Sequence, residues 1–287
     1  MLAAALLTVI SFHNLFAGTV IGFLVSAALV VSVALPSPTP TAQRGIYDRT
    51  TRGLRIYLAT PRLRGLLSLN LAVAAASAMV IVNTVVLVQA EFSLSQRATA
   101  LALAAFGGGS MIAALILPRL LEDIPDRRAM LAGAAVLAAS LFVGIVIQSY
   151  TLLLPLWFAL GLGYSLAQTP SGRLLRRSSR PEDRPALFAA QFALSHACWL
   201  ITYPVAGWLG AKVGLPITFA TLGVIAGCAV VLATRLWPAH DSDEIEHTHD
   251  TLDESDPHIA DAVHVSGAHR HRHAFVIDNY HPEWPRL

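Results

Sequence analysis

The chain has 287 residues, of which 55% are hydrophobic and only 13% are charged. Soluble domains carry about 25% charged residues, so this composition excludes an ordinary soluble protein. The charges are unevenly divided: residues 1–237 carry 17 basic and 7 acidic side chains, whereas residues 238–287 carry 3 basic and 11 acidic ones. The basic side chains stand in short loops between apolar runs, which indicates membrane topology and no nucleic-acid partner.

The apolar runs are long enough to cross a membrane as helices. A span needs about 20 apolar residues, because the hydrocarbon core is about 30 Å thick and a helix rises about 1.5 Å per residue. Residues 1–12 are too short to span, whereas residues 15–35 form a first span that the prolines within 36–40 end. Six more spans are predicted, at 65–88, 98–117, 129–148, 151–171, 186–209 and 214–236.

Loop charge predicts how the chain is oriented. The Lys and Arg content of successive loops alternates between high and low: six in 36–64, one in 89–97, three in 118–128, none in 149–150, five in 172–185 and one in 210–213. The positive-inside rule places the high-content loops in the cytoplasm. We therefore expect a multi-pass protein of the cell inner (plasma) membrane, with the lipid bilayer as partner and with both the linker 36–64 and the tail 238–287 cytoplasmic.

Two loops resemble those of the major facilitator superfamily. Residues 117–131 are similar to the acidic–basic loop that these transporters repeat, with Glu122 at the acidic position and Arg127 and Arg128 at the final basic pair. Residues 181–188 are similar to the loop before the eleventh helix of that fold. The resemblance implies that Glu122, Arg127 and Arg128 form a conformational lock at the cytoplasmic face.

Order and spacing extend the resemblance to a domain plan. The predicted fold class is an all-α integral membrane protein with about seven transmembrane helices, corresponding to helices 6–12 of a twelve-helix facilitator fold, and a disordered C-terminal tail. The expected parts are the end of an N-terminal helical half, a basic linker, a six-helix half and an acidic His-rich tail, at 1–35, 36–64, 65–237 and 238–287. The missing helices predict an N-terminally truncated chain, with a missing N-terminal half as an expected partner.

The predicted spans contain few polar side chains that could contact a substrate. Ionisable groups inside a membrane are candidates for function, and His196 is the one that lies within a span. Asn83 is an amide within the run 65–88, and Gln191 is an amide in the same run as His196. Hydrogen bonding between helices is the structural alternative for all three. We expect some of Asn83, Gln191 and His196 to line a substrate cavity.

The tail is rich in histidine. Nine of the eleven histidines follow residue 237, and two clusters alternate with other residues, at 247–249 and 269–273. Alternate side chains of an extended chain share one face, so imidazoles spaced in this way can converge on one ion. Arg270 and Arg272 oppose a cation within the second cluster. The predicted metal ligands are His247, His249, His258, His264, His269, His271 and His273.

The tail also bears on what is transported. Imidazole suits nickel, zinc and copper, so the tail is expected to bind one of these metals, although the protein requires no cofactor. A His-rich cytoplasmic tail resembles the nickel-resistance exporters of the superfamily, which implies efflux of a divalent metal. The alternatives are a drug or siderophore exporter with an incidental tail, and a non-transporting membrane-anchored metal-binding or regulatory module. Motifs for nucleophilic, phosphate-binding or zinc-peptidase catalysis are missing from the sequence, so no enzyme is predicted.

Overall fold

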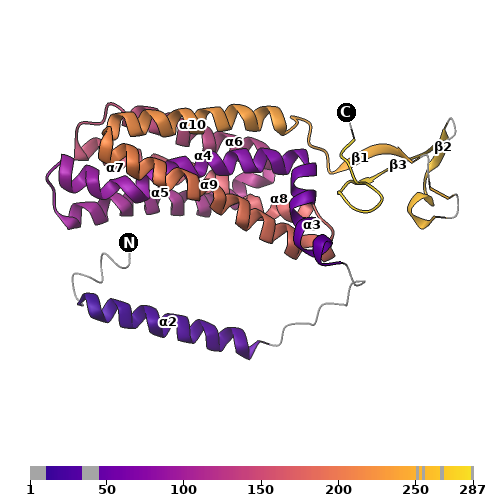
Figure 1. The fold of residues 1–287 in the computed structure, drawn as a ribbon, viewed down its shortest axis with the longest axis horizontal. Coiled ribbons are helices and arrows are strands. Elements are labelled where there is room, and N and C mark those ends of the chain that lie inside the picture. The colour runs from indigo at the N-terminus through magenta and orange to yellow at the C-terminus, as the bar shows by residue number, and fades with distance from the viewer. Residues whose placement is uncertain (1–10, 34–44, 250–251, 254–255, 266–267, 286–287) are drawn as a thin grey trace.

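The computed structural model describes residues 11–33, 45–249, 252–253, 256–265 and 268–285. Helices form most of this part of the chain, and a small sheet follows them (Figure 1). The helices are α2 (Phe12–Ser32), α3 (Ile46–Ala59), α4 (Pro61–Val85), the π-helical η1 (Val86–Glu91), α5 (Gln96–Asp123), α6 (Asp126–Gly144), α7 (Tyr150–Gln168), α8 (Ser171–Arg177), η2 (Pro181–Asp183), α9 (Arg184–Lys212) and α10 (Leu215–Leu236).

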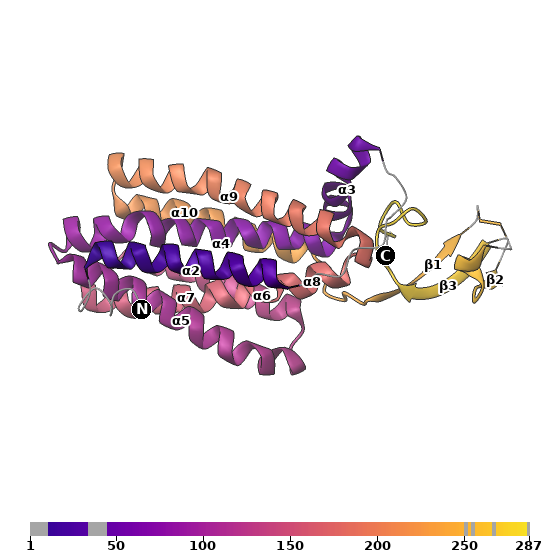
Figure 2. The same ribbon diagram turned by 90° about the horizontal axis from the view of Figure 1, so that it is seen from below.

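The all-α membrane fold predicted from the apolar runs is confirmed. Six helices in the described part of the chain are long and apolar enough to cross a membrane, and each overlaps one of the six spans predicted after the linker. These six, α4 to α7, α9 and α10, form one bundle, called here the transmembrane bundle (Figure 2). α4 lies at its centre, where most of its side chains are buried against α6, α9 and α10.

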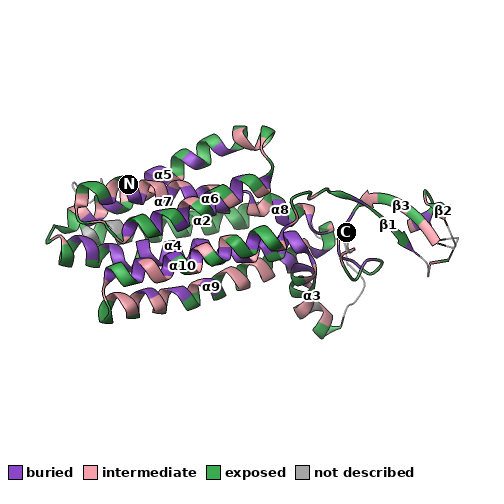
Figure 3. Ribbon diagram, turned by 90° about the horizontal axis from the view of Figure 1, so that it is seen from above, coloured by how far each residue is buried: buried purple, intermediate pink, exposed green. Residues whose placement is uncertain are grey.

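The first predicted span corresponds to α2. This helix lies apart from the transmembrane bundle (Figure 1), and each of its described side chains is exposed (Figure 3). Its described apolar stretch, Phe16–Ser32, is shorter than the six spans. The apolar segment 1–10 and the prolines within 36–40 lie outside the described residues. Inside the predicted linker, α3 is a helix that packs against α9.

Small residues allow α5 and α7 to approach each other closely. A side chain on Gly109 of α5 would collide with the backbone carbonyl of Phe158, and one on Gly161 of α7 would collide with that of Phe106. Small residues are used in this way where membrane helices pack backbone against backbone. Of the glycines at 107–109, Gly109 makes this contact, whereas Gly107 faces open space.

The loops that are rich in arginine meet at one end of the transmembrane bundle. α3, α8 and the C-terminal sheet all lie at this end (Figures 1 and 2). Arg127, from the loop between α5 and α6, also reaches it, because its Nε donates to the carbonyl oxygen of Trp237, 3.0 Å away. The alternation of loop charge therefore matches the two ends of the bundle. That this end faces the cytoplasm remains a prediction.

The prediction of a disordered tail is wrong for its described residues. They form a three-stranded antiparallel sheet in the order β1–β3–β2, from β1 (Glu244–His249), β2 (Val263–Val265) and β3 (Ala268–Ala274), with a short helix η3 (Pro257–Ile259) before β2. One face carries cross-strand ion pairs, Arg270 with Glu246 at 3.7 Å and Arg272 with Glu244 at 3.4 Å. Opposite charges across a ladder stabilise strand pairing. The two arginines therefore point away from the histidines, which occupy the other face.

Candidate metal centre in the tail

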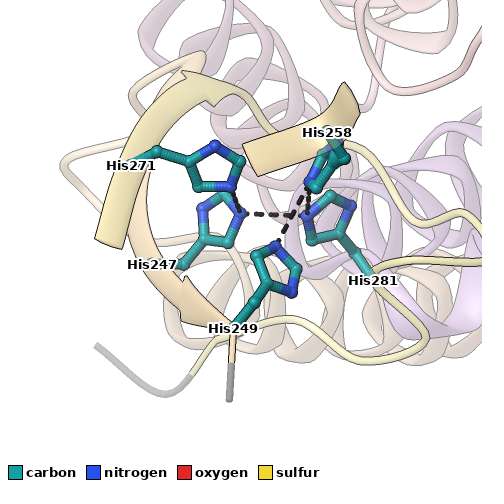
Figure 4. A group of neighbouring side chains, drawn as sticks. All are labelled: His247, His249, His258, His271 and His281. Carbon is teal, nitrogen blue, oxygen red and sulfur yellow. Dashed lines mark hydrogen bonds between the residues drawn. The ribbon is translucent and has the colours of Figure 1, made fainter. Parts of the chain in front are cut away.

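Five histidines of the tail gather around one point, and their ligand nitrogens all lie within 4.8 Å of one another (Figure 4). This five-histidine site draws on β1, η3, β3 and the segment after β3, through His247, His249, His258, His271 and His281. His247 and His271 are directly opposite each other in the β1–β3 ladder. Because side chains alternate along a strand, His249 shares the face of His247.

Neighbouring hydrogen bonds fix the tautomer of two of these ligands. Nδ1 of His281 donates to Oδ1 of Asp278 at 2.9 Å, and Nδ1 of His247 donates to the carbonyl oxygen of Ile245 at 3.0 Å. Both acceptors lack a proton of their own, so the imidazole proton must lie on Nδ1. In the neutral form of each ring, Nε2 is the nitrogen without a proton, and it faces the other histidines. Such outer hydrogen bonds orient imidazoles that bind metals.

The environment favours the neutral form of three of the ligands, His247, His258 and His271. Burial lowers the pKa of His247 to about 4, although its hydrogen bond to Ile245 opposes the shift. Burial and then the neighbouring His247 lower the pKa of His271 to about 4. The pKa of His258 is lowered as well, chiefly by burial. Neutral imidazole is the form that binds a metal ion, so these rings are ready for coordination at neutral pH.

The spacing of the nitrogens suits a transition metal. Adjacent Nε2 atoms are separated by 2.9 Å (His247–His281), 3.0 Å (His247–His271), 3.2 Å (His249–His258) and 3.3 Å (His258–His281). A metal ion about 2.1 Å from each nitrogen, with its ligands at right angles, places neighbouring nitrogens about 3.0 Å apart. Five imidazoles without a thiolate or carboxylate favour nickel, copper or zinc over calcium, magnesium or manganese.

The structure brings together four of the seven ligands predicted from sequence. His264 and His269 form a separate pair across β2 and β3, with ring centroids 4.9 Å apart. His273 borders the site, its ring centroid 4.7 Å from that of His247, and its buried Nε2 has no hydrogen-bond partner among the described residues. Sequence analysis missed His281, which belongs to neither cluster. The feature of the sequence that could have indicated His281 is the carboxylate of Asp278, three residues before it.

The beginning of the tail is fastened to the transmembrane bundle by two arginines. Arg62, at the start of α4, is 1% exposed, and its Nη1 lies 3.4 Å from Asp241 and 3.2 Å from Asp243. Arg177 of α8 pairs with the same two carboxylates, with 2.8 Å to Asp243. The indole of Trp237 also donates to Asp241, at 2.8 Å. This network fixes where β1 leaves the end of α10.

The end of the tail returns to the same place. The guanidinium carbon of Arg62 lies 5.1 Å from the ring centroid of Trp284, and its Nη2 is 3.4 Å from the carbonyl oxygen of Phe275. The rings of Phe275 and Trp284 contact each other edge to face, with centroids 5.1 Å apart. Arg62 therefore contacts both ends of the tail.

The three candidates for a substrate cavity lie at different places in the structure. Asn83 is buried in α4, and its amide donates to the carbonyl oxygen of Ala206 in α9 at 3.2 Å. Gln191 accepts a hydrogen bond from Tyr57 of α3 at 2.6 Å. His196 is exposed on α9, where its Nδ1 lies 2.8 Å from the carbonyl oxygen of Phe192. Asn83 and Gln191 thus join helices, and a cavity role for the three stays a prediction.

Of the three residues that the resemblance implied for a lock in the loop between α5 and α6, Arg127 contacts another helix. Arg127 donates to the carbonyl oxygens of Trp237 and Thr234, and so holds the C-terminal end of α10. A cation at that end also interacts favourably with the helix dipole. Glu122 and Arg128 are both exposed. The roles of Glu122 and Arg128 stay predictions.

Asp126 is the acidic residue of this loop that forms an ion pair with another helix. It was not among the residues predicted from the sequence. It is 7% exposed and pairs with Arg173 of α8, whose Nε lies 3.1 Å from Oδ1 of Asp126. The pair links the start of α6 to α8. The feature of the sequence that could have indicated Asp126 is its position next to Arg127 in the acidic–basic loop.

A bundle of six long apolar helices with its basic loops at one end defines a multi-pass membrane protein. The sequence profile described as Major Facilitator Superfamily matches residues 66–257, which run from α4 to η3. The match covers more than half of the chain, so the protein belongs to the major facilitator superfamily, whose members are transporters. Among curated proteins, none matches the chain.

Proposed function

We propose that the protein is a secondary active transporter that exports a divalent transition metal ion, with the tail binding the exported metal. The observation that carries this proposal is the five-histidine site, in which five ligand nitrogens lie within 4.8 Å of one another. Nickel is the favoured ion, because nickel(II) accepts tetragonal and higher coordination by nitrogen, whereas structural zinc sites use four ligands. Zinc and copper are the other candidates.

The position of the site supports a role in transport. The tail is held against the arginine-rich end of the transmembrane bundle by Arg62 and Arg177. By the positive-inside rule this end faces the cytoplasm, from which an exporter takes its substrate. A metal ion bound in the tail would thus be kept beside the entrance of the transport path. His196, Asn83 and Gln191 are the proposed contacts along that path, and exchange against protons is the proposed coupling.

The experiment compares metal binding and metal export for the same protein. Full-length protein in detergent is titrated with Ni²⁺, Zn²⁺ and Cu²⁺ against a chromophoric chelator at neutral pH. Cells that express the wild type or the variant His247→Ala are then loaded with nickel, and their retained nickel is measured. We expect saturable binding and lower retained nickel for the wild type, and weaker effects for the variant.

Three other results would each overturn part of the proposal. Absence of saturable binding for all three metals would remove the metal role. Binding without any change in retained nickel would favour a membrane-anchored metal-binding or regulatory module. Resistance of the cells to drugs or siderophores, with no effect on metals, would favour an exporter of organic solutes with an incidental tail.

A further inference from the structure

One carboxylate lies between the five-histidine site and the transmembrane bundle. Asp278 is 7% exposed, and its Oδ1 accepts hydrogen bonds from the backbone amides of Tyr280 and His281, each at 2.9 Å, and from Nδ1 of His281 at 2.9 Å. These three bonds fold the turn 278–281 and hold the imidazole of His281 at one angle. The ligand His281 is therefore positioned by Asp278.

The other oxygen of the same carboxylate faces the bundle. Nη2 of Arg180, in the loop between α8 and η2, lies 2.5 Å from Oδ2 of Asp278. Within the described residues this buried oxygen accepts no hydrogen bond, so the ion pair with Arg180 is what compensates its burial. Burial by itself raises the pKa of Asp278, but the bonds from His281 and the charge of Arg180 outweigh it and lower the pKa to about 2.

Arg180 belongs to a fixed part of the bundle. The amide of Asp183 donates to the carbonyl oxygen of Arg180 at 3.0 Å, and the carboxylate of Asp183 pairs with Arg52 of α3 at 2.5 Å. α9 begins at the next residue, Arg184. A cleft of about 440 Å³ also opens between this loop and the tail, and its lining includes Arg180, His258 and His271. The metal site and the loop before α9 therefore share one surface.

We propose that Asp278 is the positioning residue of the metal ligand His281, and that Arg180 couples metal binding in the tail to the loop that starts α9. This inference rests on the proposed function, because it assumes that the five-histidine site binds a metal ion. Two contacts connect the metal ligand to the bundle. Nδ1 of His281 donates to Asp278, and Asp278 forms an ion pair with Arg180. Coupling of this kind is reciprocal: if the ion pair favours metal binding, the bound metal favours the ion pair to the same extent.

The coupling gives measurable effects on affinity. Removing the carboxylate partner of a metal-binding histidine typically costs about 10- to 100-fold in metal affinity. We expect that loss for Asp278→Asn, whereas Arg180→Gln, one contact further away, should weaken affinity by roughly tenfold. Arg180→Lys keeps the charge and should retain most of the affinity. Arg176→Gln is the matched control, because Arg176 lies in α8 as an exposed side chain away from Asp278.

The test uses the full chain in nanodiscs, titrated with Ni²⁺ and Zn²⁺ against a chelator. A second readout, hydrogen exchange of the amides at 178–183, follows the reverse direction of the coupling. We expect metal to slow this exchange in the wild type and in Arg176→Gln, but not in Arg180→Gln. Circular dichroism and exchange in β1 and β3 report whether each variant remains folded, and the Arg180 variants leave the turn 278–281 itself unaltered.

The outcomes separate this inference from the proposed function. A wild type that binds no metal would refute both. If the wild type binds metal but Arg180→Gln binds it as tightly as Arg176→Gln, and metal leaves the exchange at 178–183 unchanged, the coupling is refuted while the metal site stands. If Arg180→Lys loses as much affinity as Arg180→Gln, the charge of residue 180 is not the cause and the ion-pair link is refuted.

Discussion

His247 and His271 face each other across the β1–β3 ladder, with their Nε2 atoms 3.0 Å apart. Twenty-four residues separate them in the chain, yet the antiparallel register makes them direct neighbours. The register is thus what turns a His-rich sequence into a set of converging ligands. A shift by one residue would move either histidine to the face that carries the Glu–Arg pairs.

Replacing one ligand should weaken metal binding, whereas replacing a histidine outside the site should not. We expect His247→Ala to lower Ni²⁺ affinity by at least tenfold, or about 1.4 kcal/mol, because it removes a ligand at the centre of the group. His264→Ala, a change in the separate pair with His269, should leave the affinity nearly unaltered. Chelator competition on the full chain measures both. Equal losses for the two variants would contradict the arrangement seen here.

The metal-free tail should lose stability as the pH falls from about 6.5 to about 4. Folding lowers the pKa of His247 and His271 to about 4 from the ordinary value of 6.5, chiefly through burial. Between these values the unfolded tail binds protons that the folded tail does not, so the contribution of these histidines is fully present above 6.5 and is lost on acidification. Asp278, with its pKa of about 2, stays ionised throughout this window.

Hydrogen exchange of β1 and β3 in the full chain, corrected for intrinsic rates, measures this effect. The free energy of opening should decrease from pH 7 to pH 4.5, and the amides of α7 serve as an internal control. A free energy of opening in β1 and β3 that is constant over this range would show that the histidines are not buried in their neutral form.

Substituting the glycine at the α5–α7 contact should destabilise the bundle. In Gly109→Val the new side chain would meet the backbone of Phe158, so the two helices must separate. Overpacking of this kind typically costs about 1–3 kcal/mol. Gly107→Val is the matched control in the same helix, because Gly107 has open space around it. Thermal unfolding in detergent compares the two, and an equal loss in both variants would argue against close packing at residue 109.

In the loop between α5 and α6, Asp126 should contribute more to thermal stability than Glu122. Asp126→Asn breaks the ion pair with Arg173, which ties α6 to α8, and should lower the unfolding temperature by a few degrees. Glu122→Gln should have no such effect, because Glu122 is exposed. The reverse order of the two variants in a thermal-unfolding series would restore Glu122 to the role that the family resemblance implied.

The six helices of the bundle could be predicted because each is encoded locally. A membrane span needs only a run of apolar residues of the right length, and the runs from 65 to 236 satisfy this without knowledge of their neighbours. Their ends were predicted less well, since α4 and α9 continue beyond the apolar runs to Pro61 and Lys212. The glycines at 107–109 are a run of small residues of the kind that close helix contacts use, and Gly109 makes such a contact.

The sheet of the tail could not be predicted in the same way. β3 alternates histidine with arginine, and β1 is made of glutamate, histidine and threonine with one isoleucine, so both lack the apolar alternation that marks a strand with a buried face. The spacing of His269, His271 and His273 did indicate an extended chain, and that much is confirmed. Pairing between β1 and β3 is a long-range property, and His281 joins the site only because Asp278 turns the chain back.

The contact of Arg62 with Trp284 gives the protein a built-in optical reporter. The other four tryptophans, Trp157, Trp199, Trp208 and Trp237, belong to the bundle or to the end of α10, whereas Trp284 rests against a cation and the ring of Phe275. Lifting the tail would transfer this one indole to water and change its emission. With Trp284→Phe as the reference for subtraction, intrinsic fluorescence can follow undocking of the tail in real time and without an attached dye.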